Sequence, residues 1–182
     1  MNFKNFSVKP DSALFIDRDG VINKLRHDDY VKQISEFELL EGVTESFEIL
    51  KPIFSKVFIV TNQQGIGKGL MIDDIEKIHN YFLNKIPKNI QPDKIYYCPH
   101  LKEQHCVCRK PHTGMALIAK NDFPEINLKN SIMIGDSISD IDFAKNAGMT
   151  AVFISENLEK CKDENIPVFK NLYSFAKFIN GK

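Results

Sequence analysis

The sequence predicts an α/β fold, a Rossmann-like three-layer sandwich with one central parallel sheet. Short apolar segments alternate along the chain with segments of helical periodicity, which is the pattern of βαβ units. The apolar segments are continuous, as in strands that helices cover on both faces. Polar residues follow the strands directly, at the carboxyl ends of the strands, where open α/β sheets bind ligands. A chain of 182 residues without repeats or linkers therefore suits a single domain over residues 1–182.

The composition is that of a globular protein with no overall charge. Hydrophobic residues make up 43% and charged residues 26%, and 24 basic residues balance 24 acidic ones. This balance favours neither nucleic acid nor a membrane surface, so we expect neither as a partner. The sequence has no signal peptide and no membrane-spanning run, which predicts a cytoplasmic protein whose four cysteines are reduced.

The first predicted strand and helix open the chain. Ala13–Ile16 is a continuous apolar run and is expected to be a buried strand. Gly20 follows it and permits a sharp turn. Residues 42–54 have apolar side chains at helical spacing, and Pro52 is expected to close this helix.

The second strand and helix follow the same order. Residues 56–61 are another apolar run and form the second predicted strand. The next helix has an apolar face over 75–86, with Asp73 and Asp74 before it as suitable caps. Pro87 lies just past its end, where a proline is expected.

The rest of the chain continues the alternation. A third strand over 94–97 leads into a cysteine-rich loop, and a helix over 113–122 follows with Thr113 as its expected cap. The remaining elements are a strand over 131–135, a helix over 138–147, a strand over 150–154 and a helix over 172–179. The absence of a large insertion predicts only a minimal cap over the sheet edge.

Carboxylates follow the first and fourth predicted strands. Asp17 and Asp19 come directly after the first, and Asp136 and Asp140 follow the fourth. Carboxylates a few ångströms apart repel by about 4 kcal/mol per pair at an effective dielectric constant of about 20. A site that holds Asp17, Asp19 and Asp136 together therefore requires a hard cation. Mg²⁺ suits such oxygen ligands and partial hydration.

Groups that bind a phosphoryl group lie beyond the other strands. Thr61 and Asn62 follow the second strand, and Lys110 lies beyond the third. Lys110 and Mg²⁺ would neutralise the phosphoryl group, and the Thr61 hydroxyl would hydrogen-bond its oxygens. Either Asp17 or Asp19 would then attack phosphorus as a covalent nucleophile. The other would give a proton to the leaving alkoxide and later take one from water.

A compact group of cysteines and a histidine predicts a zinc-bound loop. Cys98, His100, Cys106 and Cys108 lie within eleven positions of the sequence. Tetrahedral zinc accepts three cysteines and one histidine, and four protein ligands leave no open position, so this zinc would be structural. The alternatives are a reduced thiol cluster without metal, and ligation by His105 in place of His100. Cys161 stands apart and is expected to be an ordinary free thiol.

Two cations follow the last clustered cysteine. Three thiolates on Zn²⁺ leave about one net negative charge, which Arg109 and Lys110 can offset. Zinc would then fix a loop that directs Arg109 and Lys110 at the substrate. The alternative is a solvated basic pair with no role in binding.

Four segments resemble the motifs of haloacid-dehalogenase-type phosphatases. In chain order they are DRDG from Asp17, Thr61-Asn62, Lys110, and GDSxxDI from Gly135. This resemblance implies the fold of that superfamily, with its core at about 13–154, and an aspartyl-phosphate intermediate. It implies that Asp17 is the nucleophile and Asp19 the acid/base. It also implies that Thr61 and Lys110 hold the phosphoryl group.

The same resemblance implies the ligands of the cation. Asp17, the main-chain carbonyl of Asp19, and Asp136 would bind Mg²⁺. Asp140 is expected to orient this network and not to contact the metal.

The cysteine loop narrows the resemblance. CPH, CxCRKPHTGM and TNQQGIGKG are similar to segments of D-glycero-D-manno-heptose 1,7-bisphosphate 7-phosphatases, whose product enters lipopolysaccharide or related glycans. That resemblance implies a small phosphorylated sugar as the substrate, hydrolysed to the heptose 1-phosphate. It implies that Arg109 binds its second phosphate or its sugar, together with Tyr30, Asn62 and Lys110.

Two other functions stay open at this point. The short gap between His100 and Cys106 is more like histidinol-phosphate phosphatases, which carry the same zinc loop. A zinc-knuckle nucleic-acid-binding protein is the alternative from another class, although the zero net charge argues against it. No apolar helix face is left over for a partner subunit, so a monomer is expected.

Overall fold

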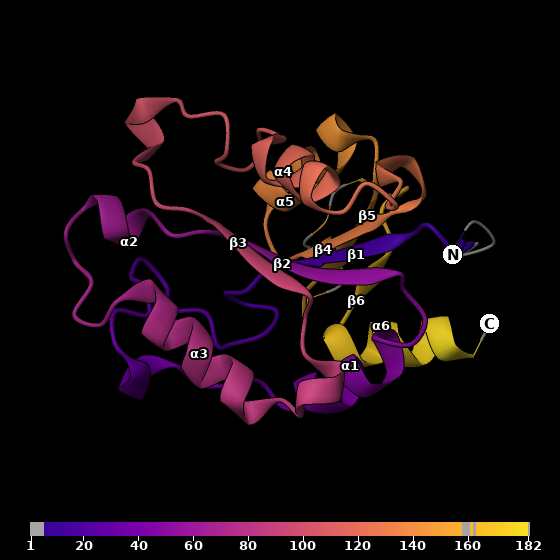
Figure 1. The fold of residues 1–182 in the computed structure, drawn as a ribbon, viewed down its shortest axis with the longest axis horizontal. Coiled ribbons are helices and arrows are strands. Elements are labelled where there is room, and N and C mark those ends of the chain that lie inside the picture. The colour runs from indigo at the N-terminus through magenta and orange to yellow at the C-terminus, as the bar shows by residue number, and fades with distance from the viewer. Residues whose placement is uncertain (1–5, 158–160, 162, 182) are drawn as a thin grey trace.

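A computed structural model describes residues 6–157, 161 and 163–181 (Figure 1). Within these residues six parallel strands form one sheet in the order β3-β2-β1-β4-β5-β6. The strands are β1 (Ala13–Ile16), β2 (Lys56–Asn62), β3 (Lys94–Cys98), β4 (Ile132–Gly135), β5 (Thr150–Ile154) and β6 (Val168–Phe169). The predicted α/β fold with a central parallel sheet is confirmed.

Helices cover both faces of the sheet, which makes the predicted three layers. Figure 1 shows α4 and α5 on one face and α1, α3 and α6 on the other. The helices are α1 (Val43–Leu50), α2 (Gln64–Gly67), α3 (Ile75–Lys85), α4 (Gly114–Asp122), α5 (Ile138–Ala147) and α6 (Leu172–Asn180). None of the helices in the described residues is long and apolar enough to cross a membrane.

The core explains why the strands are continuously apolar. In β1, Leu14 and Ile16 pack into the cluster under α1, α3 and α6, whereas Ala13 and Phe15 pack into the cluster under α4 and α5. All four side chains are fully buried. Successive side chains of a strand point to opposite faces, so a strand between two helix layers needs apolar residues at every position.

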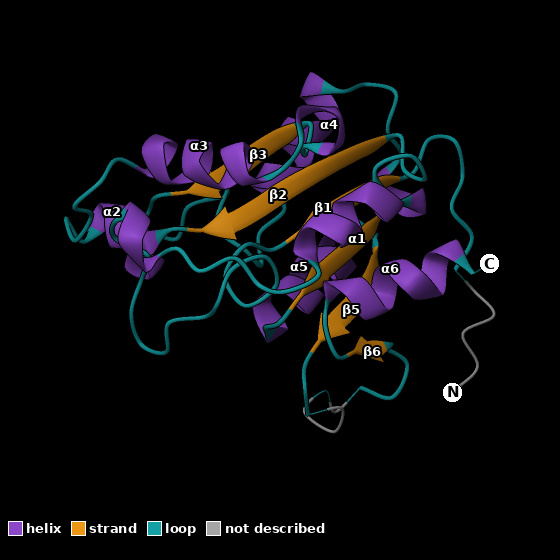
Figure 2. Cartoon of the chain, turned by 90° about the horizontal axis from the view of Figure 1, so that it is seen from below, coloured by secondary structure: helices purple, strands orange, loops and turns teal. Residues whose placement is uncertain are grey.

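The order of the strands predicts a ligand site at the carboxyl ends of the central strands. The chain runs from β1 outward through β2 to β3, and then crosses back to β4 on the other side of β1. Open α/β sheets bind ligands at the carboxyl ends of the strands where the order reverses. Here that point lies between β1 and β4. Figure 2 shows the arrow of β2 pointing toward α2, at the end of the sheet that carries the long loops.

Several element boundaries differ from the sequence-based predictions. The helix expected over 42–54 ends at Leu50, and Lys51 is its C-cap residue. Pro52 has no N–H to donate and its ring crowds the preceding turn, so it ends the helix earlier than the apolar spacing suggested. The short helix α2 and the two-residue strand β6 were not predicted, because neither is long enough to show a period.

The predicted side-chain caps are not formed. Asp74 and Thr113 occupy the N-cap positions of α3 and α4, but neither side chain accepts a capping hydrogen bond. The Asp73 carboxylate instead accepts from the Ile34 N–H at 3.0 Å, and Asp74 lies 3.7 Å from the Lys77 ammonium. The side-chain caps were wrong: Asp73 has a tertiary donor in Ile34 and Asp74 lies near Lys77 on the same helix, while nothing in the structure explains the missing Thr113 cap.

Candidate functional site

Three carboxylates meet where the strand order reverses. Asp17 follows β1, Asp136 follows β4, and Asp140 lies in the first turn of α5. Each offers an oxygen, and these oxygens all lie within 4.8 Å of one another. Asp17 is 8% exposed and Asp140 is fully buried. The predicted convergence of Asp17 and Asp136 is therefore present, and Asp140 belongs to the same cluster.

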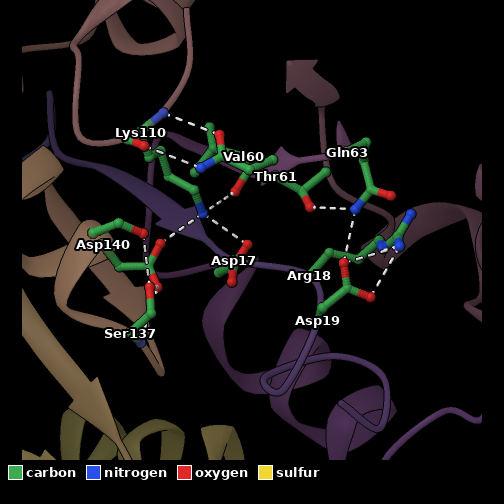
Figure 3. A network of polar contacts seen from close by, with 11 residues as sticks. Asp17, Arg18, Asp19, Val60, Thr61, Gln63, Lys110, Ser137 and Asp140 are labelled. Carbon is green, nitrogen blue, oxygen red and sulfur yellow. Dashed lines mark hydrogen bonds and ion pairs between the residues drawn. The ribbon is translucent and has the colours of Figure 1, made fainter. Parts of the chain in front are cut away.

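Lys110 supplies the positive charge of this cluster (Figure 3). Its Nζ donates to Asp17 Oδ1 at 2.7 Å and to the Val60 carbonyl at 2.8 Å, and it lies 2.6 Å from Asp140 Oδ1. Burial opposes the charge of Lys110, but Asp140 and Asp17 outweigh burial and raise the pKa of the ammonium. Lys110 therefore stays charged although it is only 4% exposed.

The carboxylates are not neutralised by Lys110 alone. Three carboxylates against one ammonium leave two net negative charges when all are ionised. Burial raises the pKa of Asp17 well above its usual range; Lys110 opposes this effect, and Asp140 and Asp136 add to it. A divalent cation among these oxygens would balance the charge, and hard oxygen donors suit Mg²⁺. The donor set therefore fits the predicted magnesium.

Asp19 points away from this cluster. Its carboxylate accepts two bonds from Arg18 Nη2, both at 2.9 Å, one from Asn23 Nδ2 at 3.0 Å and one from Gln63 Nε2 at 2.7 Å. Burial acts to raise the pKa of Asp19, but Arg18 and these hydrogen bonds together lower it. Figure 3 shows Asp17 facing Lys110 while Asp19 faces Arg18 and Gln63. The two aspartates of DRDG thus have different environments.

Thr61 and Asn62 end β2 beside the cluster. The Thr61 hydroxyl accepts from Gln63 Nε2 at 2.8 Å. Asn62 binds the main chain of Lys110 twice, accepting from its N–H at 3.0 Å and donating to its carbonyl at 3.1 Å. The side chain that was expected to contact substrate therefore holds the backbone of Lys110 in place.

The predicted zinc ligands lie together at the end of β3. The Sγ atoms of Cys98, Cys106 and Cys108 are 3.2 to 3.5 Å apart, and His100 Nδ1 lies 3.2 Å from Cys108 and 3.6 Å from Cys98. The cysteines are free, and these separations are far longer than a disulfide bond of about 2.05 Å. Tetrahedral zinc with bonds of about 2.3 Å separates its sulfurs by roughly 3.8 Å, so the site fits zinc. His100, and not His105, belongs to this group.

The chain is similar in sequence to known phosphatases. A family model described as HAD-hydrolase-like matches residues 107–173. The chain is 41% identical over 176 residues to a D-glycero-alpha-D-manno-heptose-1,7-bisphosphate 7-phosphatase of Campylobacter jejuni, covering 93% of this chain and 96% of that protein. It is 37% identical over 143 residues to the corresponding beta-heptose phosphatase of Helicobacter pylori strain J99, covering 77% and 80%.

A solved structure has the same fold. The D,D-heptose 1,7-bisphosphate phosphatase from B. bronchiseptica, complexed with magnesium and phosphate, superposes with a TM-score of 0.82. The identity is 25%, and the match covers 92% of this chain and 97% of that one. The chain belongs to the heptose-bisphosphate phosphatase family of HAD-like hydrolases.

A cavity lies next to Lys110. Its volume is about 430 Å³. Basic and imidazole side chains dominate its lining: Lys102, His105, Arg109, Lys110 and His112. Arg109 also donates to the His100 carbonyl at 3.4 Å, which ties it to the cysteine loop. The predicted basic pair thus lines this cavity, together with Asn62 and Asp142.

Tyr30 lies elsewhere. Its ring packs against Gly65 and under the Lys68 ammonium, and its hydroxyl is 3.4 Å from Gln64 Nε2. The ring is not part of the lining of the cavity beside Lys110. Tyr30 is therefore not among the predicted residues that line this cavity.

Sequence reasoning missed several residues of this phosphatase-family site. Gln63 and Arg18 bind Asp19, and His79 contacts Arg18, yet none was predicted to have a role. Gln63 and Arg18 adjoin the motifs and could have been noticed by that position. His79 lies on α3 at a core-facing position, so its sequence pattern is that of an ordinary buried residue.

Proposed function

We propose that this protein is a Mg²⁺-dependent phosphatase that hydrolyses D-glycero-D-manno-heptose 1,7-bisphosphate to the heptose 1-phosphate through an aspartyl-phosphate intermediate. The observation that carries the reaction type is the buried Lys110 ammonium, which lies between Asp17 and Asp140 where the strand order reverses. The substrate is supported by relatives with that name that align along most of the chain.

Asp17 is the proposed nucleophile. Its oxygen attacks phosphorus, and the bond from phosphorus to the oxygen on C7 of the heptose breaks. Lys110, held by Asn62, neutralises charge on the phosphoryl oxygens, and the Thr61 hydroxyl can donate to one of them. Mg²⁺, when bound by Asp17, Asp136 and the Asp19 carbonyl, supplies further neutralisation of the phosphoryl charge.

Asp19 is the proposed acid and base. It gives a proton to the departing C7 alkoxide, and then takes a proton from the water that attacks the phosphorylated Asp17. Phosphate leaves and both carboxyl groups return to their first state. The donors around Asp19 favour its ionised form, which is the form that accepts the proton of water in the second step.

The cavity beside Lys110 is the proposed place for the second phosphate and the sugar. Arg109, Lys102 and His112 line it, and their donors suit a phosphate. Relatives named for the alpha and for the beta anomer both match this chain, so the preferred anomer requires an assay.

The decisive test is phosphate release from both anomers of heptose 1,7-bisphosphate, with histidinol phosphate as the rival substrate. We expect kcat/KM to be highest for one heptose anomer and Asp17→Asn to abolish turnover, because the amide has the same shape but is a poor nucleophile. Asp11→Asn is the matched control, because Asp11 lies at the opposite end of β1 and bonds Asn130. Phosphate release by Asp17→Asn would contradict the mechanism.

We also propose that zinc at Cys98, His100, Cys106 and Cys108 is structural, and that the chain acts as a cytoplasmic monomer without nucleic acid or membrane partners. The even balance of 24 basic and 24 acidic residues supports the absence of nucleic acid and membrane partners. Sedimentation would test the monomer, and a salt-dependent titration with RNA and DNA would test the absence of nucleic-acid binding.

A further inference from the structure

Arg18 is an unusually placed charge. It is 0% exposed and is the bulkiest of the fully buried side chains among the described residues. Burying a guanidinium is costly unless charged and hydrogen-bonding partners compensate. In the described part of the chain its one ion-pair partner is Asp19, and its Nε has no hydrogen-bond partner. Core packing alone would be served better by an apolar residue.

The contact between Arg18 and Asp19 fixes the carboxyl group. Arg18 Nη2 lies 2.9 Å from both oxygens of Asp19, so one nitrogen of the guanidinium binds both oxygens of the carboxylate. The side chain of Asp19 keeps 25% of its surface exposed, whereas that of Arg18 is fully enclosed. Arg18 therefore holds Asp19 from behind, on the side away from solvent.

His79 holds Arg18 in turn. Its Nε2 lies 3.3 Å from Arg18 Nη1. A guanidinium can only donate, so Nε2 accepts and the ring is neutral with its proton on Nδ1. The ring is 3% exposed and packs edge-on against Tyr97 at 5.6 Å. Burial, and then the charge of Arg18, lower the pKa of His79 to about 3, which agrees with the neutral form.

These contacts connect α3 to Asp19 through His79 and Arg18. His79 belongs to α3, Arg18 follows β1, and Asp19 is the proposed acid and base. We propose that Arg18 and His79 are positioning residues, which act on the reaction only through the place of the Asp19 carboxyl group. This inference rests on the proposed function, because it requires that Asp19 transfers the proton.

Two substrates with different leaving groups can show whether Arg18 and His79 position Asp19 or only support the fold. An alkoxide must receive a proton as it departs, whereas p-nitrophenolate departs without one. We therefore compare kcat/KM, which covers the steps up to departure of the leaving group, for the heptose bisphosphate and for p-nitrophenyl phosphate. Loss of proton transfer costs on the order of a hundredfold or more, so misplacing Asp19 should cost at least about tenfold on the sugar ester.

The variants are His79→Phe, His79→Gln and Arg18→Lys. Phenylalanine keeps a ring against Tyr97 but removes the acceptor, and glutamine keeps an acceptor. We expect His79→Phe and Arg18→Lys to lose about tenfold or more on the sugar ester and less than about threefold on p-nitrophenyl phosphate. His79→Gln should stay within about threefold of the unmodified enzyme on both.

Phe82→Leu is the matched control, because Phe82 is another fully buried residue of α3 and packs against Phe37 and Phe47. It should lower the melting temperature without changing the ratio of the two kcat/KM values. Equal losses on both substrates, or no loss in His79→Phe, would overturn the inference. If Arg18→Lys does not fold, the two His79 variants decide. An unmodified enzyme that releases no phosphate from either ester would instead refute the proposed function.

Discussion

Gly20 sets the approach of two loops at the carboxylate site. Its φ is +89°, and a Cβ atom there would lie 2.0 Å from Asp136 Oδ2. A side chain at this position would therefore meet the carboxylate that is expected to bind Mg²⁺. Gly20 is required both by its backbone conformation and by the close approach of Asp136.

We predict that Gly20→Ala weakens Mg²⁺ activation and lowers the free energy of unfolding by about 1–3 kcal/mol. Gly69→Ala is the control for backbone strain alone, because Gly69 also has a positive φ of +67° and nothing within 4 Å of its Cβ position. Titration of activity with Mg²⁺ and thermal unfolding separate the two effects. An unchanged Mg²⁺ requirement in Gly20→Ala would contradict this account.

The loop after β3 is the element that joins the predicted zinc ligands to the site. Cys108 is followed directly by Arg109 and Lys110, and the Gly114 N–H donates to the Val107 carbonyl at 3.0 Å. Displacement of the cysteine cluster would therefore move the ammonium that lies between Asp17 and Asp140.

We predict about one zinc per chain, resistant to EDTA under conditions that remove Mg²⁺. Cys106→Ser should lose this zinc and most of the activity, because the loop that carries Arg109 and Lys110 loses its anchor at the cysteine cluster. Cys161→Ser should keep both, since Cys161 lies apart from the cluster and donates to the Asp163 carbonyl. Metal analysis and phosphate release measure the result. A zinc-free Cys106→Ser protein with full activity would show that the loop does not need the metal.

His79 joins α3 to Arg18, and its burial there predicts that the free energy of unfolding depends on pH. The pKa of His79 is lowered from 6.5 to about 3, because burial and the charge of Arg18 disfavour the protonated ring. Above pH 6.5 the ring is neutral in both the folded and the unfolded chain. Below it the unfolded chain binds a proton that the folded chain excludes, so the folded state loses up to about 1.4 kcal/mol per pH unit until about pH 3.

His79→Gln removes this contribution. The difference in free energy of unfolding between the unmodified protein and His79→Gln should shift in favour of the variant as the pH falls from 7 to 4.5. Urea unfolding across this range measures the difference. Parallel curves for the two proteins would mean that His79 is protonated in the folded state.

At the scale of the whole molecule, the carboxylate cluster connects the two halves of the sheet. Asp17 follows the central strand β1, which pairs with β2 on one side and β4 on the other, and Asp136 follows β4. A cation bound to both binds only the folded chain, because the carboxylates come together only there. Its binding free energy therefore adds to global stability.

We predict that Mg²⁺ raises the melting temperature, with a stabilisation of about 2.7 kcal/mol at a concentration one hundred times its Kd. Asp136→Asn should abolish this shift, and Asp11→Asn should retain it. Differential scanning calorimetry at several Mg²⁺ concentrations measures both. A shift that persists in Asp136→Asn would place the cation elsewhere.

The sequence by itself determined the longer strands and helices and the types of residue at the site. The continuous apolar run of Ala13–Ile16 is enough to predict a strand covered on both faces. The turn after it places Asp17 at the carboxyl end of this strand, where such sheets bind ligands. The spacing of the cysteines likewise predicts their cluster. Such signals are local, because backbone periodicity and motif spacing act over a few neighbouring residues.

Only the tertiary structure decided which of these residues meet. Asn62 binds the Lys110 backbone across 48 positions, and His79 contacts Arg18 across 61. These pairs depend on how distant strands and helices pack, for which a single sequence has no local signal. The same packing turns Asp17 and Asp19, two positions apart, toward Lys110 and Arg18 respectively. Their different charges and donors follow from the fold, because each carboxyl group responds to the partners that the tertiary structure places around it.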